Sequence, residues 1–526
     1  AYLTSSRTPG QYSNALALAA EGRYKIIYVA PERLAVDSFR DFALRAEISL
    51  VAVDEAHCVS QWGQDFRPSY LRIRDFLEGL PRRPVVGAFT ATATREVRED
   101  ILTELGLENA RTVVTGFDRT NLFYEVRQER DKYAFVRRYA ADRSEESGII
   151  YCLARKTVEE VCGRLLQDGI PATRYHAGLS DEERRRNQDA FLYEERRVMV
   201  ATNAFGMGID KSNGRYDIHS NMPNDVATYY PRTGRAGRDG EESRCILLYA
   251  PQDVRINQFL FEQGAGNEAL TEEQRALIHQ RDLERLRQMT FYATAHACLR
   301  DFILRYFGEY GSGYCGKCSN CLTEFVDEDV TETARGLISC VEESGQRFGM
   351  SVIVDMARGA GSARLRQLGL EKLPSYGSLA QIPVYRVRQV LNELIAREYL
   401  HQTSGQYPIV RLTGKSHEAL EERIVMKTVK QETQARAKKA ARGNGGASTD
   451  VNFPLFEELR QKRRELAMQE HVPPYIIFSD RTLRDMAVRM PRSQEEFLEV
   501  HGVGVSKCEK YGEKFLEIVE KYQKNP

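Results

Sequence analysis

The stretch LVAVDEAHCVSQWGQDFRPSY, residues 50–70, starts as an apolar run and ends in acidic and aromatic residues. The run 50–53 has the character of a buried parallel strand, and Asp54 and Glu55 follow it directly. One carboxylate at such a strand end can hold a water bound to Mg²⁺. The other can act as general base on a water that attacks the γ-phosphate of a nucleotide. Two solvated acids are the alternative, and the context VAVDEAH makes it the weaker one.

Runs of the same character recur through the first 250 residues, at 25–30, 85–92, 148–152 and 197–202. Charged amphipathic stretches such as 155–169 separate them. This alternation predicts buried parallel strands joined by helices, which is the α/β class. The segment 115–121 divides the runs, so we expect two parallel-sheet lobes.

Length, charge and cysteine content narrow the class of protein. A chain of 526 residues is too long for one hydrophobic core, so we expect several domains. The 75 basic and 75 acidic residues balance, which excludes a uniformly basic nucleic-acid binder but permits local basic patches. No apolar run approaches the ~20 residues of a membrane span. Ten cysteines are too few for a secreted disulfide scaffold, so we expect a cytoplasmic protein without a membrane partner.

The second half of the chain is mainly helical. A helix followed by a hairpin at 384–413 is typical of a winged helix, and the basic, core-poor stretch 427–449 reads as a linker. We expect the two lobes at 1–116 and 117–250, a zinc-binding segment at 251–333, a winged helix at 334–425, a flexible linker at 426–450 and a helical module at 451–526.

Four cysteines crowd together in the zinc-binding segment with the spacing C-x16-C-x2-C-x2-C. Four thiolates at this spacing can close a tetrahedral Zn²⁺ site, and a redox pair or unligated thiols are the alternative. The predicted ligands are Cys298, Cys315, Cys318 and Cys321. The other six cysteines are isolated and are predicted to be small core residues.

Two glycine-rich segments, 201–213 and 229–240, allow tight turns and close approach of the backbone to phosphate. Arg235 and Arg238 in the second segment can reach into a cleft between the lobes and stabilise phosphate charge. The alternative is a basic loop that binds nothing. In FTATAT, residues 89–94, threonine hydroxyls at a strand end can relay the state of a nucleotide site, or simply belong to a threonine-rich strand.

Two further segments have the residue types of DNA contacts. Trp62, the only tryptophan, is followed by Phe66 and Arg67, and such a group can stack on unpaired bases or pack as an ordinary loop. The helix predicted over 384–400 places Val384, Val387, Val390, Leu391, Leu394 and Ile395 on one face, and its arginines elsewhere. A duplex is the preferred partner of this helix, and a protein is the alternative.

Taken in order, these segments resemble the RecQ family of superfamily-two DNA helicases. The resemblance runs through VDEAHCVSQWG, FTATAT, GIIYC, YHAGL, ATNAFGMGID and GRAGRDG, then the zinc cysteines, QRFGM and VPPYIIFSD. The last of these is similar to the HRDC domain, which RecQ helicases share with RNase D. The resemblance implies two RecA-like lobes, a zinc-binding segment, a winged helix and a small all-α HRDC domain.

The resemblance also implies a function. The expected protein is an ATP-dependent 3′-to-5′ DNA helicase of recombination, repair and replication. It would use ATP, Mg²⁺ and Zn²⁺ and act as a monomer on single-stranded and forked duplex DNA near the nucleoid. Single-stranded-DNA-binding protein is a further partner that the resemblance suggests.

The family motifs carry roles onto particular residues. Catalytic roles fall on Asp54, Glu55, His57, Arg235 and Arg238. The nucleotide-binding set adds Thr90, Thr92, Gly208 and Asp210. DNA contacts fall on Gln61, Trp62, Phe66, Arg67, Arg386 and Arg388.

The sequence departs from the family pattern in four places. The phosphate loop G-x-x-x-x-G-K-[ST] is not found: 311–318 ends in a cysteine, and 409–416 has Ile409 in place of the first glycine. We expect that this loop precedes residue 1. Pro231 and Arg232 replace the usual Gln-Glu, and Gln64 replaces a histidine. Gly214 and Asp217 stand in an apolar strand, which predicts a distorted strand or a solvent-facing Asp217. A DNA-binding scaffold without a motor is therefore the rival hypothesis.

Overall fold

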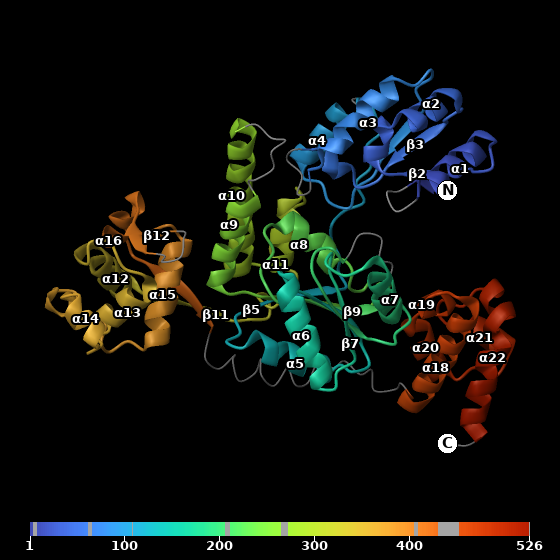
Figure 1. Ribbon diagram of the computed structural model, residues 1–526. Coiled ribbons are helices and arrows are strands. Elements are labelled where there is room, and N and C mark those ends of the chain that lie inside the picture. The colour runs from blue at the N-terminus through green and yellow to red at the C-terminus, as the bar shows by residue number, and fades with distance from the viewer. Residues whose placement is uncertain are drawn as a thin grey trace.

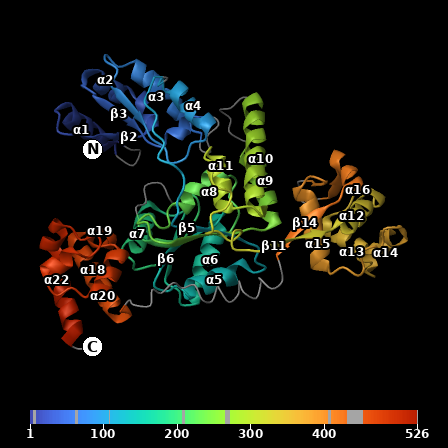
Figure 2. The same ribbon diagram turned by 180° about the vertical axis from the view of Figure 1, so that it is seen from behind.

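The structure is a computed structural model that describes residues 1–3, 8–60, 66–107, 109–205, 211–264, 272–403, 409–429 and 452–524. The second lobe lies at the centre of the molecule, with the first lobe above it (Figure 1). The winged helix and the C-terminal module lie on opposite sides of the second lobe, as the view from behind also shows (Figure 2).

The first lobe contains two parallel two-stranded sheets, β1–β2 and β3–β4. Its first helix begins where Thr8 caps the backbone amide of Gln11, and Pro9 occupies the first turn, where no amide partner is needed. The elements are β1 (Tyr2–Leu3), α1 (Pro9–Ala20), β2 (Tyr28–Val29), η1 (Pro31–Ala35), α2 (Asp37–Arg45), β3 (Leu50–Val53), η2 (Ala56–Val59), α3 (Pro68–Glu78), β4 (Val85–Ala88) and α4 (Arg95–Glu104).

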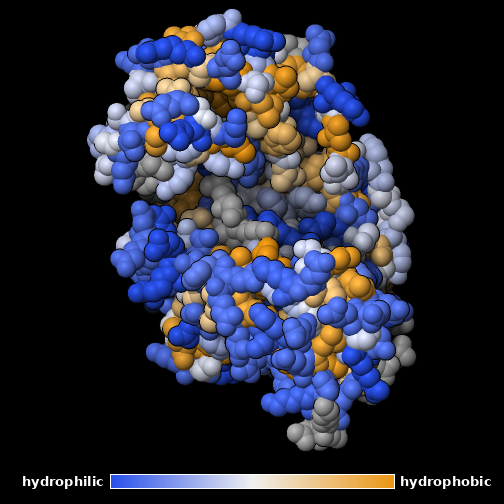
Figure 3. Space-filling view, turned by 90° about the vertical axis from the view of Figure 1, so that its right-hand side faces the viewer, coloured by the Kyte–Doolittle hydropathy of each residue, from blue (hydrophilic) through white to orange (hydrophobic). Residues whose placement is uncertain are grey.

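One face of the first-lobe sheets is exposed. Val51 and Val53 pack on the core of the lobe, while Leu50 is 60% exposed and Val85 is 70% exposed. Because side chains alternate along a strand, these exposed residues share the face opposite the core. The strands are therefore where the sequence predicted them, but the prediction that they are buried is wrong for this face. Figure 3 shows the first lobe in its upper part, with hydrophobic surface among hydrophilic surface and a hollow below.

The second lobe has a six-stranded, all-parallel sheet in the order β5-β10-β9-β6-β8-β7. Apolar clusters cover both faces, so the prediction of buried parallel strands is confirmed here. The elements are β5 (Leu122–Arg127), α5 (Lys132–Ala141), β6 (Ser147–Tyr151), α6 (Arg155–Gln167), β7 (Ala172–Tyr175), α7 (Asp181–Leu192), β8 (Val198–Ala201), β9 (Gly214–His219), α8 (Val226–Thr233) and β10 (Ser243–Leu248).

Helices follow the second lobe and lead to the cysteine cluster. Ser319 donates its amide to the carbonyl of Tyr124, so the cluster is attached to the edge strand β5 of the central sheet. The elements of this region are α9 (Pro251–Gly264), α10 (Glu272–Thr294), α11 (Leu299–Tyr306) and β11 (Phe325–Asp329).

The winged-helix region has its own apolar core. On its helix α15, Val387, Val390, Leu391 and Leu394 are buried as predicted, whereas Val384 at the first turn is 43% exposed. The elements are α12 (Thr331–Glu343), α13 (Met350–Ala357), α14 (Ala363–Gln367), η3 (Leu370–Lys372), α15 (Val384–Ala396), β12 (Leu400–Gln402), β13 (Val410–Leu412), η4 (Gly414–Ser416), α16 (Glu418–Glu421) and β14 (Val425–Val429).

The start of the predicted linker is wrong. Residues 425–429 form β14, which pairs antiparallel with β11. Although the stretch has no helical apolar stripe, the open edge of β11 supplies its hydrogen-bond partners, and Met426 is buried in the winged-helix core. Residues 430–451 lie outside the described part of the chain.

The C-terminal module is all-α, as predicted, around a core that includes Phe478, Phe497 and Phe515. Its helices are α18 (Phe453–Glu470), α19 (Pro474–Ile477), α20 (Asp480–Arg489), α21 (Gln494–Leu498) and α22 (Val505–Lys524). Within the described ranges, no helix combines the length and apolar composition that a membrane span needs.

Candidate functional site

Asp54 and Glu55 stand at the carboxyl end of β3, as the sequence predicted. The Oδ1 atom of Asp54 accepts the amide of Glu55 at 2.9 Å, and Glu55 adopts the left-handed conformation with φ 47°. A non-glycine residue in this conformation is uncommon and costs free energy, and such residues cluster at functional sites. The carboxylate of Asp54 is exposed and is the hard oxygen donor that Mg²⁺ prefers.

His57 connects the acidic pair to the neighbouring strand. Its Nδ1 atom lies 3.3 Å from the Oε2 atom of Glu55 and 2.9 Å from the Oγ1 atom of Thr90, which follows β4. Thr90 Oγ1 accepts the amide of Thr92, which is buried. The structure thus brings together four of the predicted residues of the first lobe: Glu55, His57, Thr90 and Thr92.

The aromatic segment is described only in part. Gln61, Trp62 and Gln64 lie outside the described residues, while Phe66 and Arg67 are half-buried just before α3. Tyr70, in the first turn of α3, donates its hydroxyl to the carbonyl of Asp54 at 3.4 Å. Burial raises the pKa of Tyr70 to about 12, so its hydroxyl stays a donor at neutral pH. The hydrogen bond of Tyr70 therefore attaches the start of α3 to the acidic pair.

The turn that carries Arg235 and Arg238 follows α8, and two side chains hold it by donating hydrogen bonds to its backbone carbonyls. The guanidinium of Arg119 donates to the carbonyls of Gly234, Ala236 and Gly237 at 2.8–3.2 Å. Asn121 donates to the carbonyls of Gly237 and Glu241. Gly237 has φ 59°, and a Cβ there would lie 2.5 Å from the Asn121 amide nitrogen, so the turn requires glycine.

From its sequence, the segment containing Arg119 and Asn121 is predicted only to be a lobe boundary. Their partners lie more than a hundred residues further along the chain. No local pattern in the sequence predicts these two contacts. Of the other predicted nucleotide contacts, Gly208 and Asp210 lie outside the described residues.

Asp217 is buried in β9, so the expectation that it faces solvent is wrong. Its Oδ2 atom accepts the amide of Ala236 at 3.1 Å, between the two arginines. Burial raises the pKa of Asp217 well above its usual value, and the charges of Arg235, Arg238 and Arg119 offset this in part. The strand is irregular only at its start, where its register with β6 shifts near Gly148.

The two replacements before the arginine turn are both accommodated. Helix α8 continues through Pro231. The guanidinium of Arg232 lies 5.9 Å from the ring centroid of Tyr151 on β6, and burial lowers the pKa of Arg232.

The four predicted zinc ligands come together. The Sγ atoms of Cys298, Cys315, Cys318 and Cys321 all lie within 4.8 Å of one another. Thiolates at the usual Zn–S distance of about 2.3 Å from a tetrahedral centre have similar separations. The amides of Asp301, Lys317 and Cys321 donate to these sulfurs at 3.3–3.4 Å, as outer-shell donors do at metal sites. The residues fit a tetrahedral Zn²⁺ site.

The two predicted DNA-binding arginines of α15 differ in their surroundings. Arg386 is 14% exposed, forms an ion pair with Glu328 of β11 and donates to Gln389. Arg388 is exposed and lines a groove of about 1660 Å³ between the winged helix and α10, together with Arg255, Arg287 and Lys427.

Family models match nearly all of this architecture. They are the DEAD/DEAH box helicase (residues 3–100), the helicase conserved C-terminal domain (131–240), RecQ zinc-binding (251–322), the RQC domain (324–437) and the HRDC domain (452–519). The ATP-dependent DNA helicase RecQ of Bacillus subtilis is 38% identical over 522 residues, which are 99% of this chain and 85% of that protein. The chain belongs to the RecQ family.

A second relative, the ATP-dependent DNA helicase RecQ of Haemophilus influenzae, is 32% identical over 524 residues, which are 99% of this chain and 83% of that protein. The chain is therefore an ATP-dependent DNA helicase of the RecQ type, and the family expectation is confirmed. The cysteine cluster together with the RecQ zinc-binding match identifies Zn²⁺ as its metal.

Proposed function

We propose that this RecQ helicase hydrolyses Mg²⁺-ATP between its two lobes and moves along single-stranded DNA toward the 5′ end, opening duplexes that carry a 3′ overhang. Asp54 would hold a Mg²⁺-bound water, and the ion would offset phosphate charge. Glu55 is the proposed general base, and Arg235 and Arg238 are the proposed γ-phosphate contacts.

The observation that carries this proposal is the connection from Glu55 through His57 to Thr90. It joins the proposed base to the end of the neighbouring strand. A shift of either strand end would therefore change the position of the Glu55 carboxylate, as a motor that couples DNA contact to hydrolysis requires.

The proposed path of DNA runs along the first lobe and the winged helix. Gln61, Trp62, Phe66 and Arg67 would contact the single strand beside the acidic pair, and Arg388 would contact the duplex near the fork. We further propose that the protein acts as a monomer, and that single-stranded-DNA-binding protein can be a partner.

Strand separation tests this function. Two partial duplexes of equal sequence, one with a single 3′ tail and one with a single 5′ tail, are incubated with the chain, ATP and Mg²⁺. We expect displacement only with the 3′ tail, and none by Glu55→Gln, which keeps the size of the side chain but removes the base. Displacement with the 5′ tail alone would refute the polarity.

Residues 1–526 contain no phosphate-loop motif, so the assay includes a second protein extended by the phosphate-loop segment of a RecQ relative. Displacement by the extended protein alone would support the proposed roles of Asp54, Glu55 and the two arginines. It would also show that strand separation requires the phosphate-loop segment. Binding of forked DNA by both proteins, without displacement by either, would refute the motor function.

A further inference from the structure

The C-terminal module docks on the second lobe through a buried carboxylate, Glu194. This residue follows α7 with φ 63°, and its side chain is 1% exposed. Four cations face it at 3.5–3.7 Å: Lys211 of the second lobe, and Arg460, Arg463 and Arg464 of α18. A buried carboxylate needs such partners, because a charge left alone in the interior is strongly unfavourable.

A second contact joins the start of α20 to the segment before β9. Asn213 donates its side-chain amide to Glu194 at 2.7 Å and to Asp480 at 3.3 Å. Asp480 also accepts from Arg463 at 2.7 Å. Asn213 is therefore shared between a second-lobe carboxylate and a carboxylate of the module, and all of these groups are buried.

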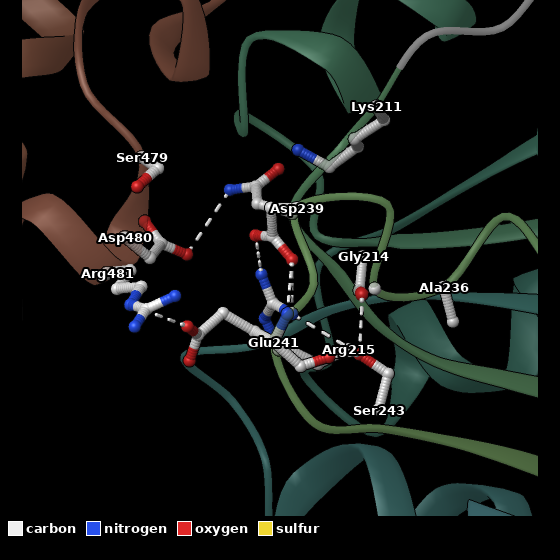
Figure 4. A network of polar contacts seen from close by, with 12 residues as sticks. Lys211, Gly214, Arg215, Ala236, Asp239, Glu241, Ser243, Ser479, Asp480 and Arg481 are labelled. Carbon is white, nitrogen blue, oxygen red and sulfur yellow. Dashed lines mark hydrogen bonds and ion pairs between the residues drawn. The ribbon is translucent and has the colours of Figure 1, made fainter. Parts of the chain in front are cut away.

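The rim of this interface has the same charge pattern. Glu241 of the second lobe lies 3.6 Å from Arg481 and 3.4 Å from Arg484 of α20. Arg460 donates to the carbonyl of Glu145 at 2.8 Å. At the rim the module therefore contributes arginines and the second lobe contributes glutamates. Figure 4 shows part of this network, with Asp480 and Arg481 facing the second lobe.

The docked segments of the second lobe are bonded directly to the turn that carries Arg235 and Arg238. Gly237 donates its amide to the carbonyl of Gly214 at 2.8 Å, and Asp239 donates to the carbonyl of Ser212 at 3.2 Å. Arg215 forms an ion pair with Asp239 and donates to Ser243 (Figure 4). Asn213 therefore belongs to one of the two paired segments, and Glu241 belongs to the other.

We propose that the docked C-terminal module is a brace that positions the arginine turn of the second lobe. The path runs from Asp480 and Arg484, through Asn213 and Glu241, to the paired segments 212–215 and 237–243. The brace holds both paired segments in place, so the arginine turn bonded to them samples fewer conformations. The link to hydrolysis rests on the proposed role of Arg235 and Arg238, whereas the docking itself does not.

Charge reversal on the full chain tests the brace. The first variant is Arg481→Glu with Arg484→Glu, which places acids against Glu241. The second is Glu241→Arg, and the third combines all three substitutions to restore opposite charges. The matched control, Arg492→Glu with Lys514→Glu, makes the same change of net charge at exposed positions of the module away from the interface.

The first measurement is amide hydrogen exchange over 211–216 and 235–243. Each reversal should accelerate exchange of the Gly237 and Asp239 amides about tenfold, the size expected when a partly exposed ion-pair network is replaced by repulsion. The combined variant should restore the wild-type rates, and the control should leave them unchanged. Equal rates in all proteins would overturn the brace.

The second measurement is the kcat and KM of DNA-stimulated ATP hydrolysis, made on each variant in the form extended by the phosphate-loop segment, with Arg235→Ala alongside. We expect the reversals to lower kcat several-fold and the combined variant to recover it. Faster exchange with unchanged kcat, while Arg235→Ala abolishes hydrolysis, would refute positioning but leave the proposed function standing. An Arg235→Ala protein with wild-type hydrolysis would refute the proposed role of Arg235, and hydrogen exchange would then decide the docking alone.

Discussion

His57 lies 2.9 Å from Thr90, Nδ1 to Oγ1, although the two residues are 33 positions apart. This contact connects the end of β3 to the end of β4, and the same Nδ1 atom faces the carboxylate of Glu55. The first lobe therefore contains a polar connection between the proposed general base and a neighbouring strand end. Its partial burial shields it from competing water.

Removal of the Thr90 hydroxyl should weaken this connection. Thr90→Val keeps the shape of the side chain and removes the partner of His57. We expect the stimulation of ATP hydrolysis by single-stranded DNA to fall about tenfold, because His57 loses a partly buried partner and the amide of Thr92 loses its acceptor, with little change in the KM for ATP. The control is Thr103→Val on α4, where the hydroxyl bonds only to the carbonyl of its own helix. Full stimulation in Thr90→Val would contradict the account.

Asp217 should make the protein less stable at neutral pH. Its folded pKa is raised, so the folded state favours the protonated acid, and its unfavourable contribution grows as pH rises above the unfolded pKa near 4. Asp217→Asn should therefore increase the free energy of unfolding at pH 7 by on the order of 1–3 kcal/mol. The gain should disappear as pH falls toward the unfolded pKa.

Urea titrations between pH 4 and pH 8 measure this difference. Tyr216→Phe is the control, because it lies next to Asp217 on β9 and its buried hydroxyl has no hydrogen-bond partner among the described residues. A gain for Asp217→Asn that is the same at every pH would show that ionisation of Asp217 is not its cause.

Cys315→Ser should remove zinc. A hydroxyl is a poor ligand beside three thiolates, so we expect loss of about one zinc ion per chain and a lower thermal midpoint. Metal analysis by mass spectrometry after dialysis against a chelator measures this. Cys508→Ala, in the C-terminal module and outside the cluster, should retain the wild-type metal content. Unchanged zinc in Cys315→Ser would exclude this cysteine as a ligand.

Arg386 and Arg388 should respond differently to alanine substitution. Arg388→Ala should weaken binding of forked DNA and reduce the slope of its salt dependence by about one charge. Arg386→Ala should instead lower thermal stability, because it breaks the ion pair with Glu328 on β11. Fluorescence anisotropy at several salt concentrations, together with thermal melts, distinguishes the two. Equal losses of DNA affinity in both variants would count against this division.

Much of the architecture and part of the candidate site could be predicted from local sequence patterns. The strand end at Asp54 and the cysteine spacing are short-range signals, since a strand and a metal site impose their residue types over a few positions. The family motifs also place Thr90 and His57, but only the folded first lobe shows that they touch.

Other features depend on contacts between distant segments. Arg119 holds the arginine turn from 115 residues or more away, and Glu194 meets α18 of the C-terminal module; neither has a local signature. The strand β14, VMKTV, forms because β11 offers a free edge, and that edge cannot be seen in the local sequence. Asp217 is buried because the amide of Ala236 and nearby arginines partly compensate its burial, and sequence alone gives no view of those partners.

The most direct test of the central claim is the rate of ATP hydrolysis, with and without single-stranded DNA, by the wild-type chain and by Glu55→Gln, each also in the form extended by a phosphate-loop segment. We predict DNA-stimulated turnover by the wild-type sequence in at least the extended form, and a fall on the order of 10³-fold on loss of the base. Turnover by Glu55→Gln equal to that of the wild type would contradict the role of Glu55, and no turnover by any form would contradict the motor itself.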